Sequence, residues 1–365
     1  MTRRADIVIV GAGMAGASLA AEIAGQASVL LLEAEDQPGY HSTGRSAAFW
    51  SETYGGPFVQ PLTSASGTFL LDRGFLSSRG ALHIADGGGH SVLAAMEAEF
   101  GDRVELKRVG ARTLQRLIPG LLPEWDDGLL EPSCADIDVA GLHAFYLKAA
   151  RSHGVSLVTH ARLLGAERGR GGWRLSTAAG DFEADVVVNA AGAWADEVTA
   201  LCGIAPAGIQ PYRRTIAQLR IDPPAPDDLP LVIDALGRFY FKPEAGGRLW
   251  LSPHDETPSA PADSAAEEYD IALAIHRLEQ VVGWRVLRVE HSWAGLRSFA
   301  PDRLPVFGFP PERRDFFWCA GQGGFGIQTA PAAAKLCATL LTGRPPQAMV
   351  AGIDPQPYDP GRFAN

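Results

Sequence analysis

The sequence predicts an α/β fold in which a domain with a parallel sheet is interrupted by a second, α+β domain built on an antiparallel sheet. Three observations support this prediction. A strand, a glycine-rich turn and a helix open the chain at Ile7, and similar patterns begin near Asp185 and near Phe316. The stretches between them carry short alternating strands and Pro/Gly-rich loops. Because the three patterns fit one sheet, the first domain is expected to be discontinuous.

The first pattern is a nucleotide-binding signature. Residues 7–10 (IVIV) are apolar without alternation, which is typical of a buried parallel strand. In the motif that follows (GAGMAG), Gly11 permits a tight turn, Gly13 lets the backbone approach a pyrophosphate, and Gly16 lets the helix pack close to the strand. The start of that helix offers unpaired N–H groups and a positive dipole end to phosphates. These features predict a Rossmann-like dinucleotide-binding domain.

An acidic residue stands where such a signature needs one. Glu33 ends the second strand, 22 residues after Gly11, and could accept a hydrogen bond from a ribose hydroxyl. A carboxylate there disfavours the 2′-phosphate of NADP but leaves NAD and FAD open. The other residues predicted to contact the dinucleotide at this turn are Met14, Ala15 and Ala34.

Composition narrows the classes of partner. The chain has 365 residues, of which 46% are hydrophobic, and a formal net charge of −10, so two domains are expected and nucleic acid or an anionic membrane is disfavoured. No apolar run is long enough to span a bilayer, and the charged start runs into the glycine motif rather than a signal peptide. We therefore expect a cytoplasmic protein without an integral membrane segment.

The cysteines carry no metal pattern. Cys134, Cys202, Cys319 and Cys337 are widely spaced and include no C-x-x-C pair. This usage is typical of reduced thiols in a protein core. The sequence therefore predicts no metal site and no covalent link between a cysteine and a cofactor.

The later patterns favour FAD over NAD. Residues 185–194 (DVVVNAAGAW) read as a strand, a small-residue turn and a helix, preceded by hairpin strands at 173–177 and 181–183. Residues 316–328 (FFWCAGQGGFGIQ) repeat the strand and glycine turn, and 329–341 read as an Ala-rich helix. Nucleotide-domain elements thus occur at the start, middle and end of the chain. A large flavin that stays bound is held by elements from such distant parts.

The second domain is expected between these patterns. Residues 239–241 and 248–252 read as strands and 264–282 as a helix, while 222–230 and 258–262 read as surface loops. We predict an FAD-binding domain made of residues 1–48, 139–205 and 291–365, and a substrate-binding domain made of residues 49–138 and 206–290.

Five strings carry a family resemblance: QPGYHSTGRSAA at 37–48, ADID at 135–138, VNAAGAW at 188–194, WAGLRSF at 293–299 and QGGFGIQT at 322–329. Through them the chain resembles, over essentially its whole length, the FAD-dependent D-amino acid oxidase/dehydrogenase superfamily, which includes glycine and sarcosine oxidases. Within it the chain is most similar to the bacterial D-arginine dehydrogenases. The resemblance implies a glutathione-reductase-like βαβ cofactor domain, non-covalent FAD, a substrate carboxylate held by arginine, and hydride transfer from the substrate Cα to flavin N5. The imine would hydrolyse to a 2-oxo acid and ammonia.

The resemblance and the residue types together indicate how FAD is held. Residues 42–47 would form a second clamp whose backbone closes on the pyrophosphate and the flavin edge; an ordinary helix start with a Ser or Thr cap is the alternative. Residues 323–328 would start a helix aimed at the flavin pyrimidine, where its dipole stabilises the reduced ring; a glycine-rich packing turn is the alternative. By family position the Leu163 backbone meets the adenine. The residues predicted to bind FAD in these and neighbouring segments are Ser42, Thr43, Gly44, Arg45, Ser46, Ala47, Ala48, Leu163, Ala191, Gly192, Gly295, Gly323, Gly324, Phe325, Gly326, Ile327 and Gln328.

Two arginines are candidates for binding the substrate carboxylate. Arg297 lies in a strand-like stretch, and a mostly buried guanidinium needs an anionic partner, which the substrate carboxylate would supply as a bidentate pair. A structural salt bridge is the alternative. Arg214, before the strand 215–221, is the second candidate, favoured over Arg213 by family position. A solvated basic pair is the alternative there.

Aromatic residues would complete the pocket. Alternation places Tyr240 on the face opposite Phe239 and Phe241, where it could bond the carboxylate, and Tyr54 matches a substrate-lid tyrosine of the family. A core tyrosine and a surface loop are the respective alternatives. The histidines show no partner in sequence and are expected to be structural; if the substrate binds with a neutral amine, no enzyme base is needed. The residues expected to line the pocket are Phe49, Ala81, Gly324 and Ile327, and the histidines are His41, His83, His254 and His291.

This chain departs from the D-arginine dehydrogenases where they read the substrate side chain. A glutamate that contacts the guanidinium is matched by Ala81, no Asp or Glu occurs within 77–85, and an active-site histidine is matched by Phe49. We therefore expect an apolar or aromatic D-amino acid rather than D-arginine, while Arg79 and His83 leave a polar or acidic side chain open. The alternatives are a secondary amine or N-substituted amino acid, as for glycine and sarcosine oxidases; less favoured are a 2-hydroxy acid and a flavoprotein with an incidental redox centre. The sequence does not distinguish O2 from a quinone as electron acceptor.

Overall fold

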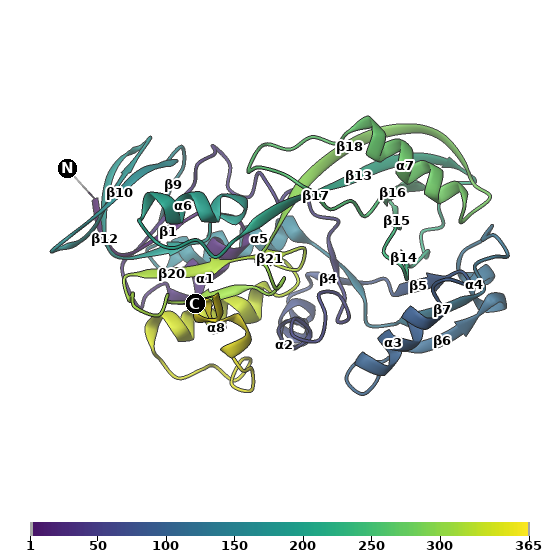
Figure 1. The fold of residues 1–365 in the computed structure, drawn as a ribbon, viewed down its shortest axis with the longest axis horizontal. Helices are drawn as coiled ribbons and strands as arrows, with labels where there is room; N and C mark the ends of the chain where they lie inside the picture. The colour runs from purple at the N-terminus through teal and green to yellow at the C-terminus, as the bar shows by residue number, and fades with distance from the viewer. Residues whose placement is uncertain (1–2, 364–365) are drawn as a thin grey trace.

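The computed structural model describes residues 3–363, and within this range the strands form sheets of eight, ten and three strands. In Figure 1 the eight-stranded sheet, with helices α1 and α8, occupies the left part of the molecule, and the ten-stranded sheet, with α7, occupies the right part. The α/β class and the antiparallel second sheet expected from the sequence are confirmed.

The eight-stranded sheet has a parallel centre. Its order is β10-β11-β12-β1-β2-β9, with β20 on β12 and β19 on β20, and β1 runs parallel to both β2 and β12. The predicted hairpin is confirmed, because β11 and β12 pair antiparallel through Ser176 and Asp181. The strands are β1 (Arg3–Val10), β2 (Val29–Leu32), β9 (Ser156–Val158), β10 (Leu163–Gly169), β11 (Gly172–Thr177), β12 (Gly180–Asn189), β19 (Val306–Gly308) and β20 (Phe316–Ala320).

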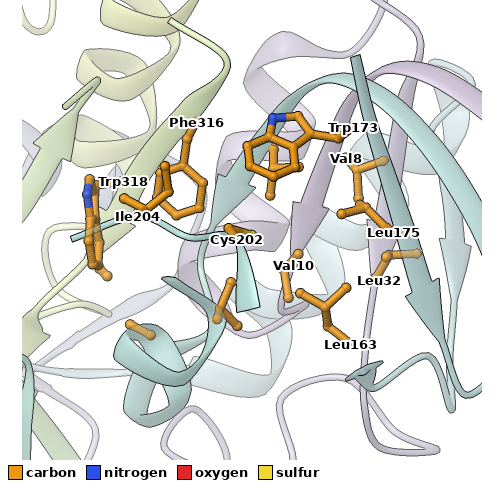
Figure 2. Close-up of a cluster of buried hydrophobic side chains, with 14 of the residues drawn as sticks. Val8, Val10, Leu32, Leu163, Trp173, Leu175, Cys202, Ile204, Phe316 and Trp318 are labelled. Atoms are coloured by element: carbon orange, nitrogen blue, oxygen red, sulfur yellow. The ribbon is translucent and has the colours of Figure 1, made fainter. Parts of the chain in front are cut away.

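The apolar run of β1 serves two cores. Successive side chains of a strand point to opposite faces, so Val8 and Val10 pack into one cluster while Ile7 and Ile9 pack into another. Figure 2 shows the first cluster, in which Val8 and Val10 lie near Trp173. The other cluster includes residues of α1 and α8, and α1 packs against both α5 and α8. The helices on and near this sheet are α1 (Met14–Ile23), α2 (Gln60–Asp72), α5 (Val139–Ser152), α6 (Ala195–Leu201) and α8 (Ala330–Thr342), with short 3-10 turns η1 (Gly192–Trp194), η2 (Gln356–Tyr358) and η3 (Pro360–Phe363).

The ten-stranded sheet is antiparallel except for the pair β5–β14. Its order is β21-β18-β13-β16-β15-β14-β5-β7-β6, with β17 on β13. Helices α4 (Ala111–Leu117) and α7 (Glu268–Glu279) cover one face, where Phe239 and Phe241 lie in the core, and α3 (His90–Phe100) packs on β5 and β7. The strands are β5 (Ala81–Ala85), β6 (Lys107–Gly110), β7 (Asp127–Glu131), β13 (Gln210–Asp222), β14 (Leu231–Asp234), β15 (Tyr240–Glu244), β16 (Arg248–Ser252), β17 (Thr257–Pro258), β18 (Arg285–Phe299) and β21 (Gln322–Gly323).

The opposite face of this sheet carries different side chains. Residues paired directly across antiparallel strands share a face, and on this face Ala81, Leu231 and Tyr240 pack in one cluster, joined by Phe49. Phe49 belongs to the small sheet, whose strands are β3 (Phe49–Trp50), β4 (Leu76–Ser78) and β8 (Ala135–Ile137). This face of the sheet therefore carries the residues predicted for substrate binding.

Three expectations about the elements need adjustment. The predicted domain boundary at residue 291 falls inside β18, because β18 pairs with β13 over its whole length, and the division into two domains stays a prediction. The helix expected over 264–282 is α7, which is shorter at both ends. The Ala-rich helix predicted over residues 329–341 is confirmed as α8, but residues 323–328 do not start it, because residues 322–323 pair with β18 and turns follow.

The described part of the chain contains neither a membrane-spanning helix nor a cluster of metal-binding side chains. No helix within residues 3–363 is long and apolar enough to cross a bilayer. No group of three or more His, Cys, Asp or Glu side chains in that range could hold a metal ion. All four cysteines are buried and unbridged.

Candidate active site

A cleft enclosing about 1640 Å³, its open mouth included, lies at the carboxyl ends of β1, β2, β12 and β20 and reaches β13 and β18. Ligands of open α/β sheets bind at these strand ends. The cleft is lined by most residues predicted to bind the cofactor, namely Gly11, Gly13, Met14, Ala15, Glu33, Ala34, Ser42, Thr43, Arg45, Ser46, Ala47, Leu163, Ala191, Gly192, Gly295, Gly323, Gly324, Gly326 and Ile327.

The glycine turn has the geometry that the sequence predicts. Gly11 has φ +103°, and a Cβ there would collide with the backbone oxygen of Ala190. Gly16 does not line the cleft; a Cβ on it would overlap the Gly11 carbonyl, so it serves the close approach of α1 to β1. The Met14 amide donates a 3.0 Å hydrogen bond to Thr43 Oγ1. The start of α1 is thus joined to the second predicted clamp.

Glu33 is held rigidly at the end of β2. Its two oxygens accept hydrogen bonds from the amides of Ala12 (3.0 Å) and Glu35 (3.1 Å). Each carboxylate oxygen keeps a second lone pair, and the side chain lines the cleft. The site therefore fits a ribose hydroxyl donor. His41 and Trp194, whose rings lie 4.6 Å apart, line the same cleft; their sequence positions alone had marked neither as a site residue.

The second clamp is made of turns, so the alternative of a helix start at residues 42–47 is wrong. The Ser42 hydroxyl donates to the Leu296 carbonyl (2.7 Å). Gly44 and Ala48 do not line the cleft, because their amides are directed to Gly39 O and Ser46 Oγ within the turn. The clamp is nevertheless fixed to the β18 strand that carries Arg297.

The segment 322–328 contributes backbone rather than a helix start. Gly323, Gly324, Gly326 and Ile327 line the cleft, but Phe325 and Gln328 do not. The Phe325 ring packs 5.9 Å from the rings of Tyr54 and Phe299. The side-chain amide of Gln328 forms hydrogen bonds with the backbone of Ser51 and Tyr54, and Gln328 is only 2% exposed. Neither side chain lines the cleft, and the assignment of Phe325 and Gln328 to cofactor binding stays a prediction.

The two predicted arginines lie together at the inner part of the cleft. Tyr212 of β13 pairs with Arg297 of β18, and Arg214 pairs with Gly295, so Arg214 and Arg297 are diagonal neighbours on one face. Arg297 lines the cleft and makes no hydrogen bond or ion pair within residues 3–363. Its guanidinium carbon lies 5.7 Å from the centre of the Tyr54 ring. The alternative of a structural salt bridge is therefore not seen in the described chain.

Arg214 is more deeply buried. It is 3% exposed, its Nε donates to the Asp255 carbonyl (2.7 Å), and its Nη2 donates to Glu256 Oε1 (3.2 Å). Its Nη1 is buried without a hydrogen-bond partner in the part of the chain that the structure describes. Burial and the charge of Arg297 lower the pKa of Arg214. Arg213 instead pairs with Glu267 and Asp270 and does not line the cleft. This agrees with the prediction that Arg214, rather than Arg213, is the second candidate for carboxylate binding.

The structure brings the predicted pocket residues together in a closed aromatic cluster. Phe49 lies 5.4 Å from Tyr54 and 6.1 Å from Tyr240, ring centre to ring centre. The Tyr240 hydroxyl is buried and has no partner in residues 3–363. Ala81 packs in the same cluster as Tyr240. None of these four residues lines the cleft, although Tyr54 lies over the guanidinium of Arg297, which does.

His254 belongs to this neighbourhood, which the sequence did not reveal. Its ring lies 5.6 Å from Tyr240 in an edge-on arrangement, its Nδ1 is 2.7 Å from the Gly237 carbonyl, and its backbone has φ +56°. Burial, followed by the charges of Arg214 and Arg297, lowers the pKa of His254 to about 3. A neutral imidazole therefore stands beside the two arginines.

A carboxylate from another strand lies next to Ala81, although it does not line the cleft. Glu131, at the end of β7, pairs directly with Ala81 of β5. Burial raises the pKa of the Glu131 carboxyl. This contact cannot be predicted from local sequence patterns, because it depends on the pairing of Ala81 with Glu131, 50 residues later in the chain.

Acid should destabilise the fold through its buried histidines. Burial lowers the pKa of His83 to about 4, while an unfolded histidine has a pKa of 6.5. The unfolded chain therefore takes up protons first, so this stability is complete above pH 6.5 and is lost as the pH falls toward 4, by about 1.4 kcal/mol per pH unit. Urea unfolding of His83→Leu between pH 7 and 5 should show a flatter dependence than the parent. The exposed His291→Leu serves as control; parallel curves for His83→Leu and the parent would contradict this.

Comparisons with known proteins support the interpretation of this cleft as a cofactor site. Residues 6–340 match the protein family described as DAO, FAD dependent oxidoreductase. A glycine oxidase of Pseudomonas putida is 33% identical over 214 residues, which is 56% of this chain and 54% of that protein. The chain spans about half the length of the first curated relatives it matches.

Two solved structures share the fold. Glycine oxidase from Geobacillus kaustophilus superposes with a TM-score of 0.85 at 24% identity, covering 100% of both chains. L-proline dehydrogenase from P. horikoshii superposes with a TM-score of 0.84 at 21% identity, covering 100% of this chain and 98% of that one. With the glycine turn, Glu33 and the second clamp lining one cleft, the residues present fit the cofactor of that family. The chain therefore belongs to the DAO family of FAD-dependent oxidoreductases, with FAD as its cofactor.

Proposed function

We propose that this chain oxidises the Cα–N bond of an amino acid whose carboxylate is bound by Arg297 and Arg214. One observation carries the proposal: Arg297 lines the cleft beside Arg214 and has no anionic partner within residues 3–363. A substrate carboxylate would complete both guanidinium groups, including the buried Nη1 of Arg214. Each charged hydrogen bond of this kind contributes about 1.5–3 kcal/mol.

The surrounding residues would orient the substrate. The Tyr240 hydroxyl has no partner in the described chain and can donate to the carboxylate, while the Tyr54 ring stands over Arg297. His254 is neutral and its pKa is far below the working range, so it cannot protonate the substrate amine. Bound FAD would supply a two-electron acceptor, and a substrate with a neutral amine would need no base from the protein. Hydrolysis of the imine would release a 2-oxo acid and ammonia.

For the side chain we propose an apolar or aromatic D-amino acid rather than D-arginine. The support is the aromatic cluster of Phe49, Tyr54 and Tyr240. Glu131, although next to Ala81, already accepts hydrogen bonds from residues 51–53 and is not exposed to the cleft. The D configuration rests on the resemblance of the site strings to D-arginine dehydrogenases.

A second candidate is an N-substituted glycine or another secondary amine. Two observations favour it. The rings of the aromatic cluster pack against one another and none of them lines the cleft, which suits a substrate with a small Cα substituent. Three of the curated relatives, at 29–33% identity, are glycine oxidases.

A substrate panel separates these candidates. Under anaerobic conditions, D-Phe, D-Leu and D-Met should bleach the flavin with kcat/KM at least about tenfold above that for D-Arg and D-Lys, since an apolar pocket rejects a charged side chain. Products distinguish the second candidate: ammonia with a 2-oxo acid indicates deamination, whereas glyoxylate with an amine indicates oxidation of an N-substituted glycine. L-amino acids complete the panel, and faster bleaching by D-Arg than by D-Phe would refute the side-chain assignment.

A further inference from the structure

Glu131 is a buried carboxylate that the proposed chemistry does not use. The residue has 0% exposure, and no lysine or arginine within residues 3–363 pairs with it. Its Oε2 accepts hydrogen bonds from the hydroxyls of Ser51 (2.9 Å) and Thr53 (2.6 Å), and its Oε1 accepts one from the Glu52 amide (2.6 Å). A buried carboxylate is costly unless such donors satisfy it. All three donors come from consecutive residues of one loop.

The same loop is held from a second side. Gln328 Oε1 accepts a hydrogen bond from the Ser51 amide (3.2 Å), and Gln328 Nε2 donates to the Tyr54 carbonyl (3.1 Å) and to Thr63 Oγ1 (2.9 Å). Residues 51–54 are therefore fixed between β7 and the segment that lines the cleft. Directly after them, Gly55 and Gly56 have φ +103° and +84°. These positive φ angles favour glycine, whose backbone is freer than that of other residues, so the hydrogen bonds to residues 51–54 restrict a segment that adjoins a flexible turn.

Tyr54 is the last residue of the anchored loop. Its ring lies against Phe49 and Phe325, at 5.4 and 5.9 Å between ring centres, and over the guanidinium of Arg297. We propose that Glu131 is a positioning residue, which acts through the loop 51–54 to hold Tyr54 over Arg297 where the substrate carboxylate binds. This inference rests on the proposed function, because that function places the substrate at Arg297.

The test uses the FAD-loaded enzyme and the isosteric variant Glu131→Gln. The glutamine side chain carries no charge and has one acceptor oxygen, where Glu131 has two, for the three donors of residues 51–53. Hydrogen exchange of the peptide containing residues 51–54 should therefore become about tenfold faster or more. The dissociation constant of benzoate, used as a carboxylate probe and followed by the flavin spectrum, should rise by about tenfold, and KM should rise with it more than kcat falls. Glu22→Gln, which weakens a half-buried pair with Lys335 elsewhere, should change neither readout.

The outcomes are distinguishable. Unchanged exchange of the loop overturns the proposal, and so does faster exchange with unchanged benzoate affinity and KM. If Glu131→Gln does not accumulate as folded flavoprotein, Thr53→Val removes one of the three donors and is judged by the same readouts. Failure of the proposed function would show differently: Arg297→Leu would leave benzoate affinity unchanged, whatever Glu131→Gln does to the loop.

Discussion

Replacing Arg297 by leucine should lower kcat/KM for the amino acid substrate by about a thousandfold, because two charged hydrogen bonds to the carboxylate are lost together. The melting temperature should stay the same or rise. Arg297 makes no ion pair within residues 3–363, so its removal leaves no described carboxylate without a partner and takes an uncompensated charge out of a half-buried site. Loss of activity without loss of stability is the signature of a ligand-binding arginine.

The neighbouring arginines provide matched controls for this experiment. Arg213→Leu breaks the pairs with Glu267 and Asp270, outside the cleft, and should lower stability while leaving kcat/KM within a few-fold. Arg214→Leu should lower both, because Glu256 loses a partner and the carboxylate site loses a cation. Steady-state kinetics with the best substrate of the panel and thermal melts measure the three variants. If Arg297→Leu retained activity within tenfold of the parent, the carboxylate site would have to lie elsewhere.

Substituting Gly11 by alanine should abolish stable binding of FAD. The new Cβ would collide with the Ala190 carbonyl, and alanine is strained at φ +103°. Relief of the collision must separate β1 from the turn after β12, and both of these line the cleft. The purified variant should therefore carry less than about a tenth of the FAD of the parent, since a loss of more than 1.4 kcal/mol is tenfold in affinity.

A control variant separates the collision of the new Cβ with Ala190 from the backbone strain at a positive φ. Gly25 also has a positive φ, of +75°, but a Cβ there meets nothing within 4 Å. Gly25→Ala should cost about 1 kcal/mol of stability and retain full FAD content. FAD per chain after gel filtration, read from absorbance, compares the two. Equal FAD content in Gly11→Ala and the parent would mean that this turn does not hold the dinucleotide.

Local signals gave most of the fold. The run at Ile7, the hairpin of β11 and β12, and the strands around Tyr240 and Arg248 were all recognisable, because each is defined by neighbours in sequence. The Ala-rich helix predicted over residues 329–341 agrees with α8, but residues 323–328 do not start a helix, since residues 322–323 pair with β18, more than twenty residues away. Pairing between distant segments overrides a local helix preference.

The residues of the candidate site also fall into those that local motifs predict and those that depend on contacts between distant segments. Arg214, Arg297 and Tyr240 were identified from residue type and motif, and the structure brings them to one face of one sheet. The sequence analysis does not place His254 and Glu131 there, because Glu131 depends on strand register and His254 lies in a loop whose packing against Tyr240 no nearby motif indicates. Gln328 was assigned to the cofactor because of its motif, whereas its amide in fact holds the loop before Tyr54.

The order in which the chain leaves the ribosome has a consequence for cofactor loading. The glycine turn after β1 is synthesised before the other parts of the cleft, and the cleft also needs β20 and residues 323–327, which follow β18 in the chain. Between them the ribosome must produce the whole ten-stranded sheet except β21. A nascent chain therefore exposes the dinucleotide turn long before the cleft can close around FAD. Capture of the flavin is a late event of biosynthesis, and the unfinished chain must stay soluble without it.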